Sequence, residues 1–271
     1  MTDSAKMARA IRRDALQMVH DARASHIGSA LSIADILAVL YADVLRMDLA
    51  DPGDAGRDRF ILSKGHACVA VYAALANAGV IPRDSLHTYG KEHSQLMNHI
   101  SHKVPGVEFS TGSLGHGLPF GVGKALSAKK RGQPWRTFVL LSDGELGEGS
   151  NWEALLFAAH HRLDNLVAVV DYNNLQSLTT VSDTLGIEPL ADKFAAFGCT
   201  PRQVNGHDHA ALLEALKTMP WSAGRPSVLI ARTTKGKGVS FMENRVEWHY
   251  KCPDREQLAR ALAEVGGQPD A

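Results

Sequence analysis

Two polar turns carry the side chains best suited to chemistry, and each follows a run of apolar residues. Asp143 follows "TFVLLS" and opens the glycine-rich stretch "DGELGEG", while Asn173 follows "LVAVVDY". A carboxylate, a carboxamide oxygen and a nearby backbone carbonyl form a hard oxygen site that suits Mg²⁺ or Ca²⁺. Mg²⁺ usually completes its octahedron with substrate phosphates and water. The two turns therefore predict a cation site that also holds a phosphorylated group.

Each turn also has an ordinary explanation, because Asp-Gly and Asn-Asn are common turn sequences. Gly144 adds a functional argument, since a glycine lets the backbone approach an oxyanion and donate its N–H. What favours a site is the placement of both turns after successive strands, with one helix between them. In open parallel sheets, ligands bind outside the carboxyl ends of the strands.

The elements that must position these side chains can be predicted from the apolar pattern. Ser150 and Glu153 form a capping box, which predicts a helix starting at Asn151 and ending near Leu163. A short strand that runs into a glycine turn is predicted within 58–67, and further strands over 137–141, 165–171 and 226–234. Helices are predicted over 4–24, 31–45, 67–79, 118–132, 190–198, 208–219 and 254–265. The helix over 31–45 is expected to be amphipathic. Residues 85–118 show little periodicity and read as a long functional loop.

Alternation of strands and helices predicts an α/β fold, a doubly wound parallel sheet with helices on both faces. No repeat or linker interrupts the pattern, so residues 1–271 are expected to form a single domain. Lys plus Arg and Asp plus Glu each number 29, which favours neither nucleic acid nor a membrane surface as a partner. The charged N-terminal sequence, three scattered cysteines and absence of a long apolar run predict a cytoplasmic, reduced protein.

Glycine-rich segments other than the Asp143 turn do not fit nucleotide motifs. "TTKGKGVSF" lacks the spacing of a phosphate loop, and "GSLGHG" follows no strand, which argues against a dinucleotide site and a dehydrogenase. The chain has 13 histidines, many of them beside glycines. Such imidazoles suggest close backbone approach to a polar ligand, although a surface turn explains any one of them equally well.

Several motifs occur together in an order that resembles a known family. They are "SKGHA", "TGSLGHGL", "DGELGEG" with the Asp143–Asn173 spacing, and "KGKGVSFMEN" followed by "WH". Together they resemble the thiamine-diphosphate-binding (PP-type) domain of transketolases over nearly the whole chain. The similarity is greatest to the N-terminal subunit of split, two-chain transketolases.

The resemblance implies thiamine diphosphate and Mg²⁺ as cofactors, with Ca²⁺ or Mn²⁺ as possible substitutes. It implies that Asp143, Asn173 and the main-chain carbonyl of Leu175 ligate the metal. The implied cofactor-binding residues are His66, Leu114, Gly115, Asp143, Gly144, Glu148, Asn173 and His249, with Glu148 also in a hydrogen-bond network between subunits. The implied catalytic histidines are His26, His66, His99 and His249. His116 either faces the site or lies exposed.

The chain departs from the family pattern at two places. Ser142 stands where the family commonly has glycine, a small-for-small exchange that should preserve the metal site. Asn98-His99-Ile100 stands where the family often has Gly-His-Pro, so His99 is assigned on weaker similarity than the other histidines.

The resemblance also implies a partner subunit. Activation of the cofactor needs a glutamate on a separate pyrimidine-binding domain, and no second α/β domain follows here. We therefore expect a C-terminal transketolase subunit in an α2β2 assembly, acting on sugar phosphates. A specialised transketolase for an unusual branched or sulfonated ketose, and a non-catalytic thiamine-diphosphate-binding protein, remain as alternatives.

Overall fold

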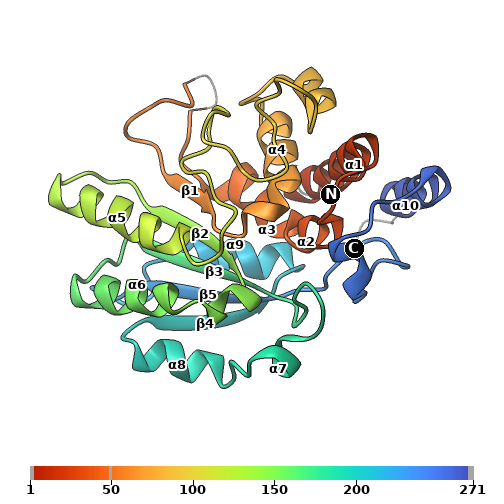
Figure 1. Cartoon of the computed structure of the whole chain (residues 1–271). Coiled ribbons are helices and arrows are strands. Elements are labelled where there is room, and N and C mark those ends of the chain that lie inside the picture. The colour runs from red at the N-terminus through yellow and green to blue at the C-terminus, as the bar shows by residue number, and fades with distance from the viewer. Residues whose placement is uncertain (1–2, 49–50, 268–271) are drawn as a thin grey trace.

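The centre of the molecule is a parallel sheet of five strands (Figure 1). This computed structural model describes residues 3–48 and 51–267. The spatial order is β1-β2-β3-β5-β4, and every neighbouring pair is parallel. The strands are β1 Arg59–Leu62, β2 Thr137–Ser142, β3 Leu166–Tyr172, β4 Thr200–Asn205 and β5 Ser227–Arg232. Because the strands are parallel, all five carboxyl ends meet at one edge.

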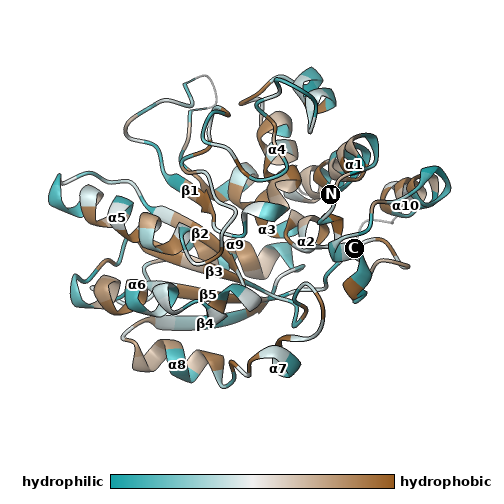
Figure 2. Ribbon diagram, viewed as in Figure 1, coloured by the Kyte–Doolittle hydropathy of each residue, from teal (hydrophilic) through white to brown (hydrophobic). Residues whose placement is uncertain are grey.

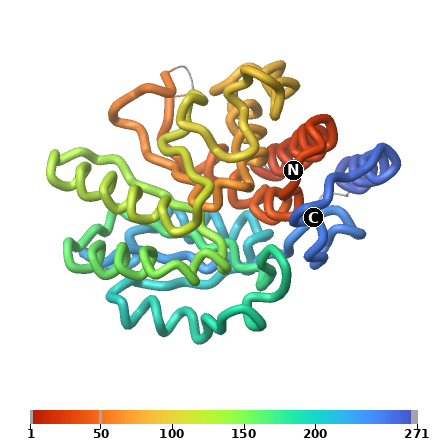
Figure 3. The backbone as a smooth tube through the Cα atoms, in the orientation of Figure 1, coloured from red at the N-terminus to blue at the C-terminus, as the bar shows by residue number. Residues whose placement is uncertain are grey.

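The connections between the strands are mostly helical. The α-helices are α1 Asp3–Ala22, α2 Ile27–Ser32, α3 Ala34–Val39, α4 Cys68–Asn77, α5 Gly117–Lys130, α6 Gly149–His160, α7 Val181–Thr184, α8 Leu190–Ala196, α9 His209–Lys217 and α10 Arg255–Gly267. A π-helical turn covers Leu40–Val44, and short 3₁₀ turns cover Gly65–Ala67, Arg83–Thr88, Gly144–Gly147 and Val246–His249. The first and last helices, α1 and α10, lie side by side (Figure 3).

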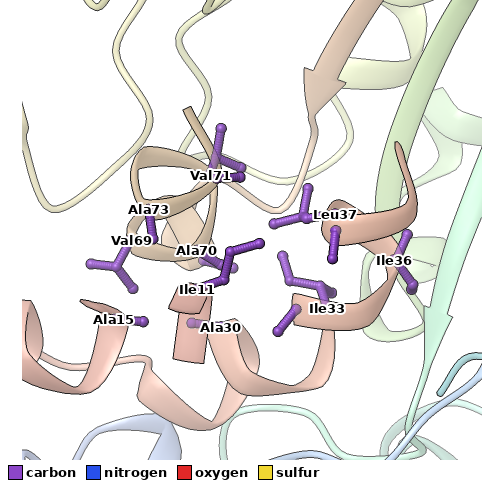
Figure 4. Close-up of a cluster of buried hydrophobic side chains, with 14 of the residues drawn as sticks. Ile11, Ala15, Ala30, Ile33, Ile36, Leu37, Val69, Ala70, Val71 and Ala73 are labelled. Carbon is purple, nitrogen blue, oxygen red and sulfur yellow. The ribbon is translucent and has the colours of Figure 1, made fainter. Parts of the chain in front are cut away.

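Helices cover both faces of the sheet, as the apolar strands require (Figure 2). Phe138 and Leu140 of β2 point into a core formed with α1–α4 and α9, part of which Figure 4 shows in close-up. Val139 and Leu141 of the same strand point into a second core with α5, α6 and α8. Successive residues of one strand thus enter opposite layers. The predicted doubly wound α/β fold is confirmed.

The predicted amphipathic helix over 31–45 is wrong in shape and in exposure. The segment is divided among α2, α3 and a π-helical turn, with Ile33 (φ −99°, ψ 1°) breaking the first two apart. Every residue from Ile27 to Leu40 is buried. The polar members are satisfied internally, since Arg12 donates to both carboxylate oxygens of Asp35 at 3.0 and 2.6 Å. Internal pairing lets a segment with polar residues lie in the core.

Two further elements differ from what the sequence predicted. The strand β4 was not predicted, because it is a half-exposed edge strand with Pro201 and Arg202 instead of an apolar run. The helix α6 begins at Gly149, not Asn151, and its capping box is absent. The hydroxyl of Ser150 instead donates to the carbonyl of Gly115 at 2.7 Å.

No helix among the described residues combines the length and the apolar character that crossing a membrane would need.

Candidate functional site

A polar cavity of about 220 Å³ lies at the carboxyl ends of the strands. Its walls come from the turns after β1, β2, β3 and β5, from α2, and from the segments around His99 and His249. It is lined by His26, Ser29, Lys64, His66, His99, Gly112, Leu114, Ser142, Asp143, Gly144, Asn173, Leu175, Gln176, Ser177, Lys235 and His249. The sheet topology thus gathers most of the residues that the sequence singles out.

Asp143 joins the tips of β2 and β3 at the floor of this cavity. The residue is 1% exposed. Its Oδ2 accepts the backbone N–H groups of Asn173 (2.9 Å) and Asn174 (2.5 Å), and its Oδ1 accepts that of Gly144 (2.7 Å). Burial and the nearby carboxylate of Asp171 raise the pKa of Asp143 to about 6. The backbone donors and the Lys64 ammonium lower this pKa but do not outweigh burial, so a bound cation would further stabilise the ionised carboxylate.

Asn173 and Leu175 follow β3 and carry the two neutral oxygens that the sequence assigns to the metal. The Asn173 Nδ2 donates to Asp171 Oδ2 at 3.1 Å, and its Oδ1 accepts the Leu175 N–H at 3.1 Å. Both residues line the cavity with Asp143. The described residues contain no cluster of three or more His, Cys, Asp or Glu side chains able to hold a metal. Any cation here would rely on one carboxylate, an amide and a carbonyl.

Two buried lysines bring positive charge to the cavity. Lys64 is 1% exposed and pairs with Asp171 at 2.6 Å. Lys235, equally buried, donates to the carbonyls of Leu175 (3.2 Å) and Gln176 (2.7 Å) and lies 3.0 Å from His249 Nδ1. Burial and the Lys64 ammonium lower the pKa of Lys235 to about 8. Both lysines line the cavity and so bring positive charge to its wall.

The four predicted catalytic histidines converge on the cavity from separate segments. The His26 ring lies with its centroid 4.9 Å from that of His249, 5.1 Å from His66 and 5.8 Å from His99. His26 has a left-handed backbone (φ 73°), and its N–H donates to the His249 carbonyl at 2.8 Å. This bond fixes the start of α2 to the turn that carries His249.

All four imidazoles are held in the neutral form. Burial together with the neighbouring His99 and lysines lowers the pKa of His26 to about 4. Burial and Lys235 lower that of His249 to about 3. Burial lowers the pKa of His66 well below its ordinary value and also lowers that of His99. Neutral rings can each accept and donate a hydrogen bond near pH 7.

The predicted residues of the glycine-rich loop divide into two groups. Leu114 lines the cavity, whereas Gly115 (φ 81°) lies behind it and donates its N–H to Glu145 Oε1 at 2.9 Å. Glu148 is exposed at the N-cap of α6 and does not border the cavity. His116 is also exposed, and its ring contacts the Leu114 carbonyl. Of the two positions expected for His116, facing the site or lying exposed, the structure shows the exposed one.

Several site residues were not predicted. Ser29, Lys64, Gln176 and Lys235 line the cavity, and Asp171 supports it from beneath. Asp171 could have been found from the sequence, because it is a charged residue near the end of an otherwise apolar strand. A charged side chain is almost never fully buried unless it is paired, so its position there indicates a buried partner.

Glu145 is the other overlooked carboxylate, and it is fully buried. It binds Ser63 Oγ and the N–H groups of Gly115 (2.9 Å) and Ser142 (3.3 Å). Glu145 therefore fastens the glycine-rich loop to the turns after β1 and β2. Its sequence context, "DGELGEG", offered no way to tell it from the exposed Glu148.

Comparison with known proteins places this geometry in a family context. Residues 3–271 match the family model described as "Transketolase, thiamine diphosphate binding domain". The chain is 45% identical over 262 residues to an apulose-4-phosphate transketolase subunit from Actinobacillus succinogenes, covering 96% of this chain and 95% of that protein. It is 36% identical to a 6-deoxy-6-sulfo-D-fructose transketolase subunit from Clostridium sp., covering 97% and 96%.

Solved transketolase structures resemble the fold of this chain over nearly its whole length. The transketolase from Leishmania mexicana superposes with a TM-score of 0.90 at 31% identity, covering 98% of this chain. The chain spans only 42% of the length of that protein.

Proposed function

Since this chain belongs to the transketolase family, we propose that it binds thiamine diphosphate with a divalent cation as the N-terminal subunit of a two-chain transketolase. The reaction would move a two-carbon ketol unit from a ketose phosphate to an aldose phosphate. The observation that carries the proposal is the buried Asp143, which binds the β3 tip and whose pKa is raised by burial despite the nearby Lys64 ammonium. The cation is proposed to be Mg²⁺, with Ca²⁺ or Mn²⁺ as substitutes.

The donor set fits a hard cation accompanied by a diphosphate. Asp143 supplies a carboxylate, and Asn173 and Leu175 supply two neutral oxygens, which leaves the remaining positions of an octahedron to phosphate and water. A single protein carboxylate is typical of Mg²⁺ sites that depend on substrate phosphates. Deprotonation of Asp143 would accompany metal binding, because the ligand must be ionised.

The opposite wall suits the negative charge of the diphosphate. Lys235 would meet it directly, and His66 and His249 would donate ring N–H groups. Gly144 keeps the β2 turn close to the cavity, since a Cβ there would lie 2.9 Å from the Gln176 side chain. Its N–H donates to Asp143 Oδ1 and thereby holds the carboxylate in the turn.

When bound, thiamine diphosphate supplies the nucleophilic carbon and the electron sink for cleavage of a carbon–carbon bond. The chain's own contribution is positioning and proton exchange. His26, His66, His99 and His249 would hydrogen-bond the hydroxyl and carbonyl oxygens of the sugar and exchange protons with them. Their neutral state at pH 7 makes each ring both a donor and an acceptor. We retain Gly115, Leu114 and Glu148 as proposed supports of the cofactor side and of the subunit interface.

A partner chain completes the proposal. Two relatives, covered over 95% and 90% of their own lengths, are named as transketolase subunits. We propose that a C-terminal subunit with a pyrimidine-binding domain provides the activating glutamate and most sugar-phosphate contacts in an α2β2 complex. Mixing purified subunits tests this: ketol transfer should require both chains. Substantial transfer by the 271-residue chain alone would refute it.

A second candidate function is that of a transketolase specialised for one ketose. The relatives named for apulose 4-phosphate and 6-deoxy-6-sulfo-D-fructose favour an unusual ketose. Steady-state rates of the two-subunit complex with apulose 4-phosphate and with xylulose 5-phosphate would decide between the specialised and the general enzyme. A non-catalytic thiamine-diphosphate-binding protein is less well supported, because a cofactor holder needs no convergence of four imidazoles.

Two further predictions belong to the same proposal. The single-domain assignment for residues 1–271 stays a prediction, which limited proteolysis tests by looking for one resistant core. The cytoplasmic location also stays a prediction, motivated by the charged N-terminal sequence "MTDSAKMARAIRR". Cell fractionation with an antibody against the chain would test it.

A further inference from the structure

A fully buried carboxylate ties together the strand tips from which the proposed metal site is built. Asp171, at the end of β3, is 0% exposed. Its Oδ2 accepts Lys64 Nζ (2.6 Å), Ser32 Oγ (2.6 Å) and Asn173 Nδ2 (3.1 Å), and its Oδ1 accepts the Thr233 hydroxyl. The donors come from α2 and from the turns after β1, β3 and β5.

The backbone of Asp171 extends this connection to β2. Its carbonyl accepts the N–H of Asp143 at 3.2 Å, so the residue is bonded to both proposed side-chain ligands of the metal. Asp143 is reached through its main chain and Asn173 through its side chain. Of these two links, the one to Asn173 acts on a rotatable group and therefore controls which atom faces the cavity.

The chemistry of the neighbours fixes the orientation of the Asn173 amide. An ionised carboxylate only accepts hydrogen bonds, and a backbone N–H only donates. Asp171 therefore requires the NH₂ end of the amide, and the Leu175 N–H requires the oxygen end. Reversing the amide would oppose donor to donor at Leu175 and acceptor to acceptor at Asp171. The assignment follows from these partners and does not depend on distinguishing the two amide atoms directly.

Lys64 makes this arrangement possible in a buried place. An unpaired carboxylate at 0% exposure would be strongly disfavoured, and the Lys64 ammonium at 2.6 Å supplies the counter-charge. Lys64 also donates to the Ser29 carbonyl at 3.3 Å, which ties it to α2. The pair is thus built into the wall of the cavity and can hold Asn173 without itself ligating a metal.

We propose that Asp171, held by Lys64, is a positioning residue that turns the carboxamide oxygen of Asn173 toward the divalent cation. This inference rests on the proposed function, because it assigns the purpose of Asp171 to a metal bound at Asp143, Asn173 and Leu175. Groups beyond the ligands typically change metal affinity by about 10–100-fold when they are removed.

The test measures the Mg²⁺ concentration needed for half-maximal thiamine diphosphate binding, by calorimetry on the full chain. In Asp171→Leu the half-saturating Mg²⁺ concentration should rise by about 10–100-fold. Asp171→Asn should retain most of the affinity, because its carbonyl can still accept from Asn173 and its NH₂ can face the Thr233 hydroxyl. This rescue would show that the acceptor at this position matters.

A double-mutant cycle separates positioning from general support of the fold. If Asp171 acts through Asn173, then adding Asp171→Leu to Asn173→Ala should change the Mg²⁺ requirement by less than about twofold. The proposal would be overturned if Asp171→Leu weakened Mg²⁺ binding as much in the Asn173→Ala variant as in wild type. It would also be overturned if Asp171→Leu bound Mg²⁺ with wild-type affinity. Should Asp171→Leu fail to fold, Lys64→Met/Asp171→Leu replaces it and is compared with Lys64→Met alone, so that the loss of the Lys64 charge is accounted for.

Asp58 provides a matched control, because it is another buried carboxylate paired with basic residues. It precedes β1 at the amino end of the sheet, 3% exposed and bound to Arg46 and Arg136. Asp58→Leu should lower stability and leave the Mg²⁺ requirement unchanged. An equal loss of Mg²⁺ affinity in Asp58→Leu would attribute the Asp171 effect to instability and refute its positioning role.

The same titrations separate the proposed function from this inference. If wild type binds no thiamine diphosphate with Mg²⁺, the proposed function fails. If only Asn173→Ala weakens binding, the function stands and this inference fails.

Discussion

Two buried carboxylates, Asp58 at the amino end of the sheet and Asp143 at the carboxyl end, have pKa values that are shifted in opposite directions. At the amino end, burial disfavours ionisation of Asp58, but hydrogen bonds from Arg46 and Arg136 outweigh it and lower the pKa. At the carboxyl end, burial and Asp171 raise the pKa of Asp143 to about 6. Both carboxylates are almost fully enclosed. Asp58 is paired directly with two arginines, whereas at Asp143 burial outweighs the hydrogen bonds and the Lys64 charge, so a cationic ligand would stabilise the ionised carboxylate.

The amino end should therefore respond to mutation through stability alone. Asp58→Leu leaves two arginines without their carboxylate and should lower the free energy of unfolding by about 3 kcal/mol. Arg46 is half exposed and can rehydrate, which keeps the loss at the lower end of the range for buried pairs. Urea unfolding measures the effect. A loss below about 1 kcal/mol, the value typical of a surface pair, would contradict the assignment of a structural role.

Close packing at the carboxyl end predicts the next largest effect. A Cβ on Gly65, between Lys64 and His66, would lie 2.2 Å from the Thr111 carbonyl oxygen. Because a backbone atom cannot move aside as a flexible side chain can, Gly65→Ala should lower the free energy of unfolding by about 2 kcal/mol or more. Gly123→Ala is the matched control, because Gly123 is exposed on α5 and a Cβ there meets nothing within 4 Å; it should stabilise the protein by about 1 kcal/mol. Equal melting temperatures for the two variants would show that the crowding at Gly65 has been misjudged.

The sequence predicted the parts of the molecule in which one residue type dominates. Apolar runs identified β2, β3 and β5, and the turns that follow them located Asp143 and Asn173. It did not predict β4, whose polar residues fit a half-exposed edge, nor the division of 31–45 into separate helical turns. Lys64, Asp171 and Glu145 were overlooked because their roles depend on partners far away in sequence. Pairings of that kind appear only when the strand tips meet.

The smallest predicted effect concerns acid stability at the carboxyl end. His26 and His249 have folded-state pKa values of about 4 and about 3, below the value of about 6.5 expected when unfolded. Between pH 6.5 and 4 the unfolded chain therefore binds protons that the folded chain does not, so stability falls as the pH falls. His249→Asn, without added cofactor, should lose less stability than wild type between pH 7.5 and 5. An identical loss in urea unfolding would show that His249 is not held neutral.

The central claim is that Asp143 and the β3 turn share a cation that holds a diphosphate. Calorimetric titration of thiamine diphosphate in the presence of Mg²⁺, on wild type and on Asp143→Ala, tests it most directly. We predict Mg²⁺-dependent binding to wild type and its loss, or weakening by at least about 100-fold, in the variant. Binding of equal affinity to both proteins would contradict the account.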